Sequence, residues 1–589
     1  MTTPNLAVPA ARPLAGLPRT GFKTFLMAAG LLVLGAYLVY PLLLLLVMSF
    51  NTAPDVVVPP YQFGLTNWTQ AWSTPGIFES LRNSFIIWAS VLSISFPTAV
   101  AISLVLARTN IPHTHKLEFM FWIAYIFPSV ATTLGWIMLM APEWGFLNKL
   151  AEMVPFVEKG PFNIYSVPGI VWAKLMGDGI AFKVILLTPA FRNMDGALEE
   201  ASRVSGSSNL RTMLRVTIPM MISPIVLILS LQLVRMFQGF DTEYILGAKF
   251  GFFVYSTQIY RLVRLEVIPQ YQQAVVLASV TLLLIAIVIP LQQWIVGRRR
   301  YTTVDSAFRP GLIDLGRFRG PIFAVIVVLT ILLTVAPAFV IFVGSFMARV
   351  GFFNTTPLFT PIHWQKVLGD RQFQTALATT LTLATTAGVL SPILFSLLAY
   401  VIVRTRMAGR SILDGLIWLS AAMPGILVGL GLLLMYLTTP GLKVMFGTIW
   451  ILLIVVVISG VTTGTNVFKG VLVQIGASLE EAGRVSGAGW IRTYFRIVIP
   501  VLMPTMVLVG MLNFVAAASM TSNVILLASR ETNTLSILAL QFSASGANLE
   551  EAGIISLIIM LLTMGVALPM RALALRLGVR HDPAGGHLS

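Results

Sequence analysis

The residues best suited to specific chemistry form a polar motif that occurs twice. Residues 198–219 read LEEASRVSGSSNLRTMLRVTIP, and residues 479–500 read LEEAGRVSGAGWIRTYFRIVIP. The copies lie 281 residues apart and match without a gap at 13 of 22 positions, so they are two versions of one element. Their glutamates offer hydrogen-bond acceptors, and their alanines leave a small surface against which another chain could lie closely. Two such polar islands in very apolar sequence predict two docking points outside the membrane.

Each copy is predicted to fold as a helix, a tight turn and a second helix. Good helix formers run from Glu199 to Val204, and Gly206 stands where a left-handed cap would end that helix. Residues 207–209 can cap the second helix, which we expect Pro219 to terminate just before the next apolar run. The second copy has Ala-Gly-Trp at residues 488–490, which is a weaker cap. The feature that the two copies share is therefore the turn and not the cap of the second helix.

The first helix and the turn of each copy supply the candidates for docking. Glu200 offers an acceptor near Arg203, three residues further along the same helical face. One copy alone would also suit an amphipathic helix that lies in the membrane interface, with its arginines on anionic lipid. The repetition favours docking. The candidate residues are Glu199, Glu200, Ala201, Arg203 and Gly206 in the first copy, and Glu480, Glu481, Ala482, Arg484 and Gly487 in the second.

The composition is that of a membrane protein. Of the 589 residues, 57% are hydrophobic and only 11% are charged, a balance that leaves too little charge for the surface of a soluble protein of this size. Cysteine is absent, which excludes disulfides, thiolate metal sites and cysteine nucleophiles. The net charge of +16 comes from short loops between apolar runs, a distribution typical of cytoplasmic loops rather than of nucleic-acid binding.

Apolar runs of about 20 residues, the length that spans a bilayer, recur along the whole chain. They predict an all-α polytopic membrane protein with about twelve spans, six in each half. The predicted spans are residues 23–50, 80–107, 117–141, 168–191, 219–239 and 273–297 in the first half, and 320–346, 373–403, 412–438, 446–468, 501–522 and 552–572 in the second.

Alternate loops between these spans are rich in arginine and lysine, which predicts that both termini and both copies of the motif face the cytoplasm. Six spans return the chain to its starting side, so the two halves have parallel orientation. The first apolar run is too long for a cleaved signal peptide and is predicted to be a span. The predicted domains are a disordered cytoplasmic N-terminus (1–20), a first transmembrane domain (21–297), a cytoplasmic linker (298–319), a second transmembrane domain (320–575) and a disordered C-terminal tail (576–589).

The motif resembles the hallmark of the permease subunits of ABC-type importers, which reads Glu-Ala-Ala, three residues, Gly, nine residues, then Ile-x-Leu-Pro. The departures are mild, because Ser202 and Gly483 replace the second alanine and isoleucine replaces the leucine before each proline. The resemblance covers residues 20 to 575 and is strongest to the fused, double-length permeases of ferric iron importers. The matching residues are Glu200, Ala201, Gly206, Val216, Ile218 and Pro219, and Glu481, Ala482, Gly487, Ile497, Ile499 and Pro500.

The resemblance implies a machine and its partners. Two separate ATP-binding subunits would close on ATP, move the two docking elements and rock the two halves about a central path. A periplasmic or extracellular binding protein would deliver the solute, and the chain would lie in lipid, in the bacterial inner membrane. Ferric iron is the implied solute. Thiamine importers have a similar fused permease, and a phosphonate or a polyamine is a further alternative.

Other candidate sites are weaker. The sequence has no Gly-Lys dipeptide and therefore no Walker A loop, so ATP hydrolysis must take place in a partner, and the chain is predicted to be neither an enzyme nor a cofactor-binding protein. Residues 550–553 read Glu-Glu-Ala-Gly like a third copy, but Leu557 stands where glycine is needed, and the topology places them outside. No metal site is predicted from the five histidines, which are His113, His115, His363, His581 and His587.

Two charged residues fall inside the fourth predicted span. Lys174 and Asp178 are four residues apart, so we expect them to neutralise each other on one helical face, with the lining of a solute path as the alternative. Arg235, near the outer end of the fifth span, is predicted to snorkel or to pair with Asp241 or Glu243.

Two other functions would suit a chain with twelve spans. An ion-coupled secondary transporter needs acidic residues inside the membrane, whereas nearly all acids of this chain fall in predicted loops, and its two docking motifs would have no purpose. A membrane-embedded enzyme needs a cluster of catalytic side chains, and the predicted spans contain no paired carboxylates and no serine motif. The sequence therefore favours the permease of an ATP-driven importer.

Overall fold

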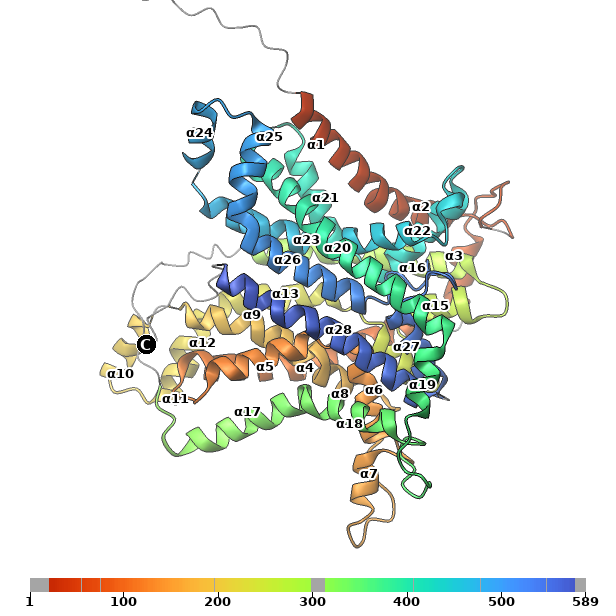
Figure 1. The fold of residues 1–589 in the computed structure, drawn as a ribbon, viewed down its shortest axis with the longest axis vertical. Coiled ribbons are helices and arrows are strands. Elements are labelled where there is room, and N and C mark those ends of the chain that lie inside the picture. The colour runs from red at the N-terminus through yellow and green to blue at the C-terminus, as the bar shows by residue number, and fades with distance from the viewer. Residues whose placement is uncertain are drawn as a thin grey trace, which may run out of the picture.

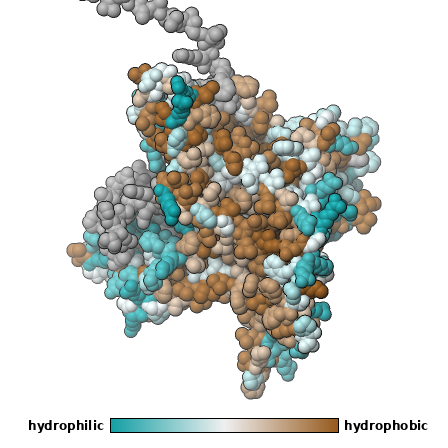
Figure 2. Space-filling view, viewed as in Figure 1, coloured by the Kyte–Doolittle hydropathy of each residue, from teal (hydrophilic) through white to brown (hydrophobic). Residues whose placement is uncertain are grey.

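The computed structural model describes residues 21–297 and 313–577, except for positions 55, 75, 195, 406, 477 and 547. In these residues the regular structure is helical, and β-structure is limited to isolated bridges. The long helices run side by side in one bundle (Figure 1). A hydrophobic band covers its middle, and hydrophilic residues gather toward two opposite ends, as expected of a membrane-spanning bundle (Figure 2). The predicted N-terminal segment, most of the linker and nearly all of the C-terminal tail lie outside the described residues.

The first half contains the helices that position both candidate sites. In chain order they are α1 Gly21–Leu34, η1 Gly35–Val39, α2 Tyr40–Met48, α3 Thr66–Ser73, α4 Ile77–Arg108, α5 Thr114–Ile126, α6 Ser129–Met140, α7 Phe146–Ala151, α8 Val167–Lys174, η2 Leu175–Gly179, α9 Ile180–Arg192, α10 Ala197–Val204, α11 Asn209–Thr212, η3 Met213–Thr217, α12 Ile218–Met220, α13 Ile222–Arg235, α14 Asp241–Gly247, η4 Ala248–Phe250, α15 Tyr255–Tyr260, η5 Arg261–Leu265 and α16 Tyr271–Gly297.

The second half repeats most of this order. Its helices are η6 Gly316–Phe318, α17 Arg319–Leu333, α18 Val335–Phe346, α19 Ile362–Gly369, α20 Arg371–Arg404, α21 Arg410–Ala422, α22 Gly425–Thr438, η7 Lys443–Met445, α23 Ile449–Gln474, α24 Ser478–Val485, α25 Trp490–Thr493, η8 Tyr494–Val498, α26 Ile499–Ser519, α27 Leu535–Ser545 and α28 Leu549–Arg576.

The spans differ from the predicted ones mainly in shape. Eight helices of the described chain are long and apolar enough to cross a membrane, and three bent helix pairs raise the number to eleven. The third predicted span of each half is bent, by 98° between α5 and α6 and by 110° between α21 and α22. Each bend lies at a proline, Pro128 or Pro424, because proline forces the residue before it out of helical geometry. The remaining span, the fourth of the prediction, is α8–η2–α9, which carries Lys174, Asp178 and Lys183 and is not among these eleven.

Equivalent contacts show which residues of the two halves correspond. The Ser84 hydroxyl in α4 accepts a hydrogen bond from the N–H of Tyr255, and the Thr380 hydroxyl in α20 accepts one from Leu535. These helices therefore correspond with an offset of 296 residues. In the polar motif the offset is 281 residues, because the π-helices η3 and η8 occupy the same place in the two copies, and at Tyr255 and Leu535 it is 280.

The second half is packed more tightly than the first where α20 crosses α26. A Cβ atom on Gly510 would lie 2.6 Å from the carbonyl oxygen of Gly388, so the two backbones meet without side chains between them. The corresponding residues of the first half are Leu92 and Leu229, and α4 makes few contacts with α13. The first half is therefore more open at this level.

Replacing Gly510 by valine is expected to lower the stability of the second half by about 1–3 kcal/mol, the usual cost of overpacking. The new side chain would meet the backbone of α20, which cannot move aside as a flexible side chain could. The melting temperature of the purified protein in detergent measures this loss. Gly565→Val in α28 is the matched control, because a Cβ there would have no neighbour within 4 Å. Equal melting temperatures of the two variants would contradict the close approach.

Candidate functional site

The two copies of the polar motif project from the same end of the bundle (Figure 1). We call residues 197–220 repeat element 1, which comprises α10, α11, η3 and α12, and residues 478–500 repeat element 2, which comprises α24, α25, η8 and the start of α26. In each, a helix of eight residues is followed by a turn and a second helix that leads into the bundle. The predicted helix–turn–helix fold of both copies is thus present.

The turn of each repeat element has the predicted left-handed glycine. Gly206 has φ +84° and Gly487 has φ +79°, a conformation that residues with a side chain rarely adopt. Next to Gly206, the N–H of Ser207 donates to the carbonyl of Ser202 at 3.1 Å, which closes a Schellman cap. The Ser208 hydroxyl accepts from the N–H of Arg211 at 3.4 Å and caps the second helix as predicted.

The second helix does not end at Pro219, and this prediction was wrong. The helical chain continues through Pro219 to Met220 and bends by 62° only beyond it, while its counterpart runs through Pro500 without a break to Ser519. In both elements a π-helix of five residues precedes the Ile-Pro pair. The residue before each proline closes a π turn, since the N–H of Ile218 donates to the carbonyl of Met213 and that of Ile499 to the carbonyl of Tyr494.

A buried ion pair fastens repeat element 1 to the end of α4. Arg108, the last residue of that helix, pairs with Glu199, and their side chains are only 2% and 1% exposed. The Thr217 hydroxyl donates to the other oxygen of Glu199 at 2.6 Å, so both carboxylate oxygens are bonded. The guanidinium of Arg108 also donates to the carbonyl of Met194. These contacts join α10 directly to a spanning helix.

Repeat element 2 is fastened in the same way to the end of α20. Arg404, again the last helical residue, lies 3.1 Å from Glu480, and the Tyr400 hydroxyl donates to that carboxylate at 2.8 Å. The side chain of Arg404 is 15% exposed, so this pair is less completely buried than the pair at Arg108. In the sequence, both arginines indicate only the topology of the chain. Their common position at the end of the second span of each half was the signal for this shared role.

The remaining predicted docking residues lie on the outer face of the repeat elements. Ala201, Glu481, Ala482 and both turn glycines are exposed, while Glu200 and Arg203 are half-buried, and among the described ion pairs none joins Glu200 to Arg203. The side chain of Arg484 is outside the described residues. Val204 and Val485 occupy equivalent positions at the tips and are each 89% exposed. Glu199 and Glu480, by contrast, face inward and position the helices.

The end of the linker lies beside repeat element 1. Ile313 bridges to Thr109 after α4, and the side chain of Asn110 donates to the Asp314 carboxylate at 2.6 Å. The backbone N–H of Gly316 and the amide of Asn110 together hold the pKa of the Asp314 carboxyl below its usual range. The amide of Asn209, in repeat element 1, reaches the Asp314 carbonyl at 3.5 Å.

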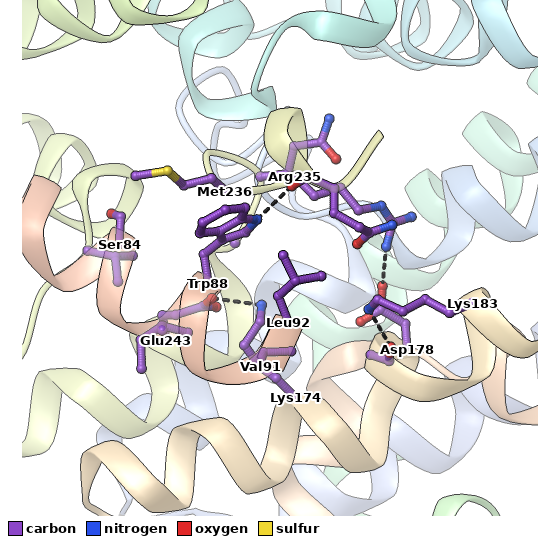
Figure 3. A pocket seen from close by; sticks show the side chains of 16 residues that line it. Ser84, Trp88, Val91, Leu92, Lys174, Asp178, Lys183, Arg235, Met236 and Glu243 are labelled. Carbon is purple, nitrogen blue, oxygen red and sulfur yellow. Dashed lines mark hydrogen bonds and ion pairs between the residues drawn. The ribbon is translucent and has the colours of Figure 1, made fainter. Parts of the chain in front are cut away.

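A second candidate site is a charged cavity of about 220 Å³ inside the first half (Figure 3). Lys174 pairs with Glu243 at 2.7 Å, and Arg235 pairs with Asp178 at 3.0 Å. The prediction that Lys174 and Asp178 neutralise each other was therefore wrong, as was the pairing of Arg235 with Asp241 or Glu243. The reason is local. The π turn η2 and the non-helical Gly177 interrupt the helix between the two residues, so they no longer share one face.

Lys183 was missed by the sequence analysis and completes the charged lining. It is 3% exposed, and its ammonium donates to the carbonyl of Gly179 at 2.6 Å. In the part of the chain that the structure describes, no acidic side chain forms an ion pair with it. Figure 3 shows Asp178 and Lys183 together below Arg235, with Glu243 and Lys174 on the other side of the cavity.

The apparent third copy of the motif has a structural role. Glu550 and Glu551 begin α28 at the end of the bundle opposite α10 and α24 (Figure 1). Glu550 accepts a hydrogen bond from the N–H of Val350, and Glu551 pairs with Lys366 in α19. His581 and His587 lie outside the described residues, and within these no group of three or more metal-binding side chains is found.

Comparisons with known proteins agree with the repeat. The family model described as "Binding-protein-dependent transport system inner membrane component" matches residues 99–301 and 392–578. The ferric transport system permease protein FbpB of Actinobacillus pleuropneumoniae is 25% identical over 517 residues, which cover 85% of this chain and 71% of that protein. The putative ferric transport system permease protein FbpB 1 of Haemophilus influenzae is 26% identical over 64% of this chain and 58% of its own length.

Other relatives are permeases of different systems. The inner membrane ABC transporter permease protein YcjO of Escherichia coli is 23% identical over 40% of this chain and 83% of its own length. Among solved structures, a bacterial alginate ABC importer is 14% identical, with a TM-score of 0.41 over 48% of this chain and 98% of the matched chain. The family model matches once in each half, as the repeated motif predicted. This chain therefore belongs to the family of binding-protein-dependent transport system inner membrane components, as an ABC importer permease with both family domains in one polypeptide.

Proposed function

We propose that this chain is the complete membrane pathway of an ATP-driven importer, with residues 21–297 and 320–575 as its two permease domains. Two separate ATP-binding subunits dock on repeat elements 1 and 2, at the cytoplasmic face, where both chain termini also lie. A periplasmic or extracellular binding protein delivers the solute to the opposite face. The proposal rests on the family match in both halves.

One observation carries the docking assignment. Each repeat element joins an exposed apolar tip to a buried ion pair at the end of a spanning helix, Val204 with Arg108–Glu199 and Val485 with Arg404–Glu480. A helix that only rested on lipid would need no such pair, because burying two charges is costly unless they are bonded to each other. The same construction occurs twice, at one end of the bundle, which suits two identical partners.

The mechanism that follows is mechanical. When the ATP-binding subunits close on ATP, α10 and α24 move with them. The ion pairs transmit that movement to α4 and α20, whose far ends lie on the side from which solute enters. The two halves then rock against each other, and the path between them opens to one side at a time. ATP hydrolysis takes place in the partner subunits.

Ferric iron is the solute that we propose. Both FbpB relatives are named as ferric transport permeases, and one of them aligns with 85% of this chain. Thiamine, a phosphonate and a polyamine remain the alternatives, because the solute of such systems is selected largely by the binding protein. Permeases of sugar systems are also among the relatives, so membership of the family does not by itself select iron.

Uptake in cells that express this chain with its neighbouring ATP-binding and solute-binding genes tests the proposal. We expect radiolabelled ferric iron to accumulate only when the ATPase is intact. ATPase-dependent uptake of thiamine, a phosphonate or a polyamine in place of iron would support an ATP-driven importer and show that its solute is not iron. Uptake that ignores the ATPase and collapses with the proton gradient would show an ion-coupled secondary transporter instead.

A further inference from the structure

The charged lining of this cavity is not repeated at the corresponding residues of the second half. Its sixteen lining residues lie between Ser84 and Val254, in α4, η2, α9, α13 and the segments next to them. α9 and α23 lead directly into the two repeat elements, so their residues are compared at the same offset of 281 residues, at which four of the lining charges are replaced by uncharged residues. Lys174 corresponds to Val455, Asp178 to Ser459, Lys183 to Gly464 and Arg235 to Ala516.

The packing of the two halves differs at the level of the cavity. In the second half, a Cβ atom on Gly464 would lie 2.1 Å from the ring of Phe395, so that ring fills the space at this glycine. The corresponding pair in the first half is Lys183 and Ala99, where the long side chain comes from the other helix. The cavity-lining Leu92 likewise corresponds to Gly388, at which α20 and α26 meet. At the positions where the first half has charged lining residues, the second half has uncharged residues and direct contact between helices.

A purely structural role does not account for this charge. A charged side chain inside a bilayer is costly, and the second half reaches the same fold without these residues. The helix that carries Lys174, Asp178 and Lys183 is broken by η2 at this level, and broken helices with π turns occur frequently at functional sites. A Cβ on Gly179 would lie 2.5 Å from the Lys174 carbonyl, so the break requires glycine there.

The lining has an excess of positive charge. Three cations, Lys174, Lys183 and Arg235, face two acids, Asp178 and Glu243. Each acid is already paired with a cation, and Lys183 is the ammonium that remains. Asp241 lies close by but is not part of the lining, and its carboxylate accepts the hydroxyl of Ser129. A solute that enters this space therefore meets donors from lysine and arginine, the groups that bind carboxylates and phosphonates.

We propose that this cavity is a solute subsite for a small oxyanion, with Lys183 as its binding cation and Arg235 as a second cation that Asp178 holds in place. The inference rests on the proposed function and narrows its solute class. The oxyanion is either the solute itself, such as a phosphonate, or the carboxylate shell of a chelated ferric ion. Bare Fe³⁺, a polyamine and thiamine are disfavoured, because a cation would be repelled by Lys183 and would find both acids occupied.

Opposite charge changes test the subsite. Lys183→Gln is expected to raise the KM for ATP-driven uptake of an anionic probe about tenfold or more, the usual effect of losing one hydrogen bond to a charged group. Asp178→Asn removes one negative charge from the lining and frees Arg235 from its ion pair, so it is expected to lower that KM. Lys183→Arg keeps the charge and should stay near the wild type. Lys443→Gln, at an exposed position outside the cavity, is the matched control.

Ferric citrate and methylphosphonate are the anionic probes, and putrescine and thiamine are the cationic ones. The shift in melting temperature of the purified chain with each probe is measured in parallel, because a bound solute stabilises the folded state. A probe that stabilises the wild type and the Lys183→Arg variant, but not Lys183→Gln, supports the subsite, and which of the two anions does so identifies the source of the oxyanion.

Three results would overturn the subsite. The first is an equal rise of the KM in Lys183→Gln and Asp178→Asn. The second is a higher melting temperature with the cationic probes alone, and the third is an unchanged melting temperature with both anions. Failure of the proposed function is distinct, since it would remove ATPase-dependent uptake of every probe while leaving stabilisation by an anion, and its dependence on Lys183, in place.

Discussion

Replacing Arg108 by methionine is expected to abolish ATP-driven uptake and to cost about 3–5 kcal/mol of stability, the usual effect of removing one partner of a buried ion pair. Glu199 would keep only the hydroxyl of Thr217 and would be a buried charge without a cation. The repeat element would then lose its fixed attachment to α4. Uptake measures the coupling, and thermal denaturation in detergent measures the stability.

The double variant Arg108→Met with Glu199→Gln separates charge from coupling. It removes both charges, so most of the stability is expected to return, while uptake stays impaired because the rigid link to α4 is gone. Arg404→Met should cost less than Arg108→Met, since Arg404 is more exposed and the Tyr400 hydroxyl still bonds Glu480. Full uptake by Arg108→Met would refute the role of the pair in transmission.

Replacing Val204 and Val485 together by aspartate is expected to prevent the ATP-binding subunits from binding. Both valines are 89% exposed at the tips of the repeat elements, where a partner would bury them. A buried carboxylate without a cation is costly, and a central apolar contact contributes about 2 kcal/mol or more to binding. Copurification of tagged ATP-binding subunits with this chain measures the loss.

Each single substitution should weaken copurification less than the double one, because two linked contacts reinforce each other. Val444→Asp is the matched control, since Val444 is 86% exposed in the loop between α22 and α23, away from the repeat elements. All four variants should match the wild type in melting temperature. Unchanged copurification of the double variant would place docking elsewhere on the chain.

The helices, the repeat and its turn could be predicted because their signals are local. A run of about 20 apolar residues specifies a span by its own length, and a glycine at the end of a helix specifies a left-handed cap by its lack of a Cβ. The repeat could be recognised in the sequence because the two copies share identical residues in a gapless alignment. These features need no knowledge of what lies across the bundle.

The ion pairs of both sites depended on tertiary structure. Arg108 and Glu199 are 91 residues apart, and Arg235 and Asp178 are 57 residues apart, so no local pattern joins them. The expected pair of Lys174 and Asp178 assumed a regular helix, and the π turn with Gly177 removed the shared face on which it relied. Pro219 failed as a stop signal for a related reason, because a π turn before it had already changed the hydrogen-bond register.

The asymmetry of the two halves also became visible only in three dimensions. Lys183 against Gly464 and Ala99 against Phe395 are unremarkable differences when each position is considered alone. Packed together, they show that one half fills its centre with an aromatic ring and the other leaves it open with a buried ammonium. The sequence by itself determined the fold class and the repeated motif with its turn, since each depends on local geometry and apolar length. Only the tertiary structure decided which half is hollow and which charges meet there, because both depend on the volumes that distant helices bring to the same place.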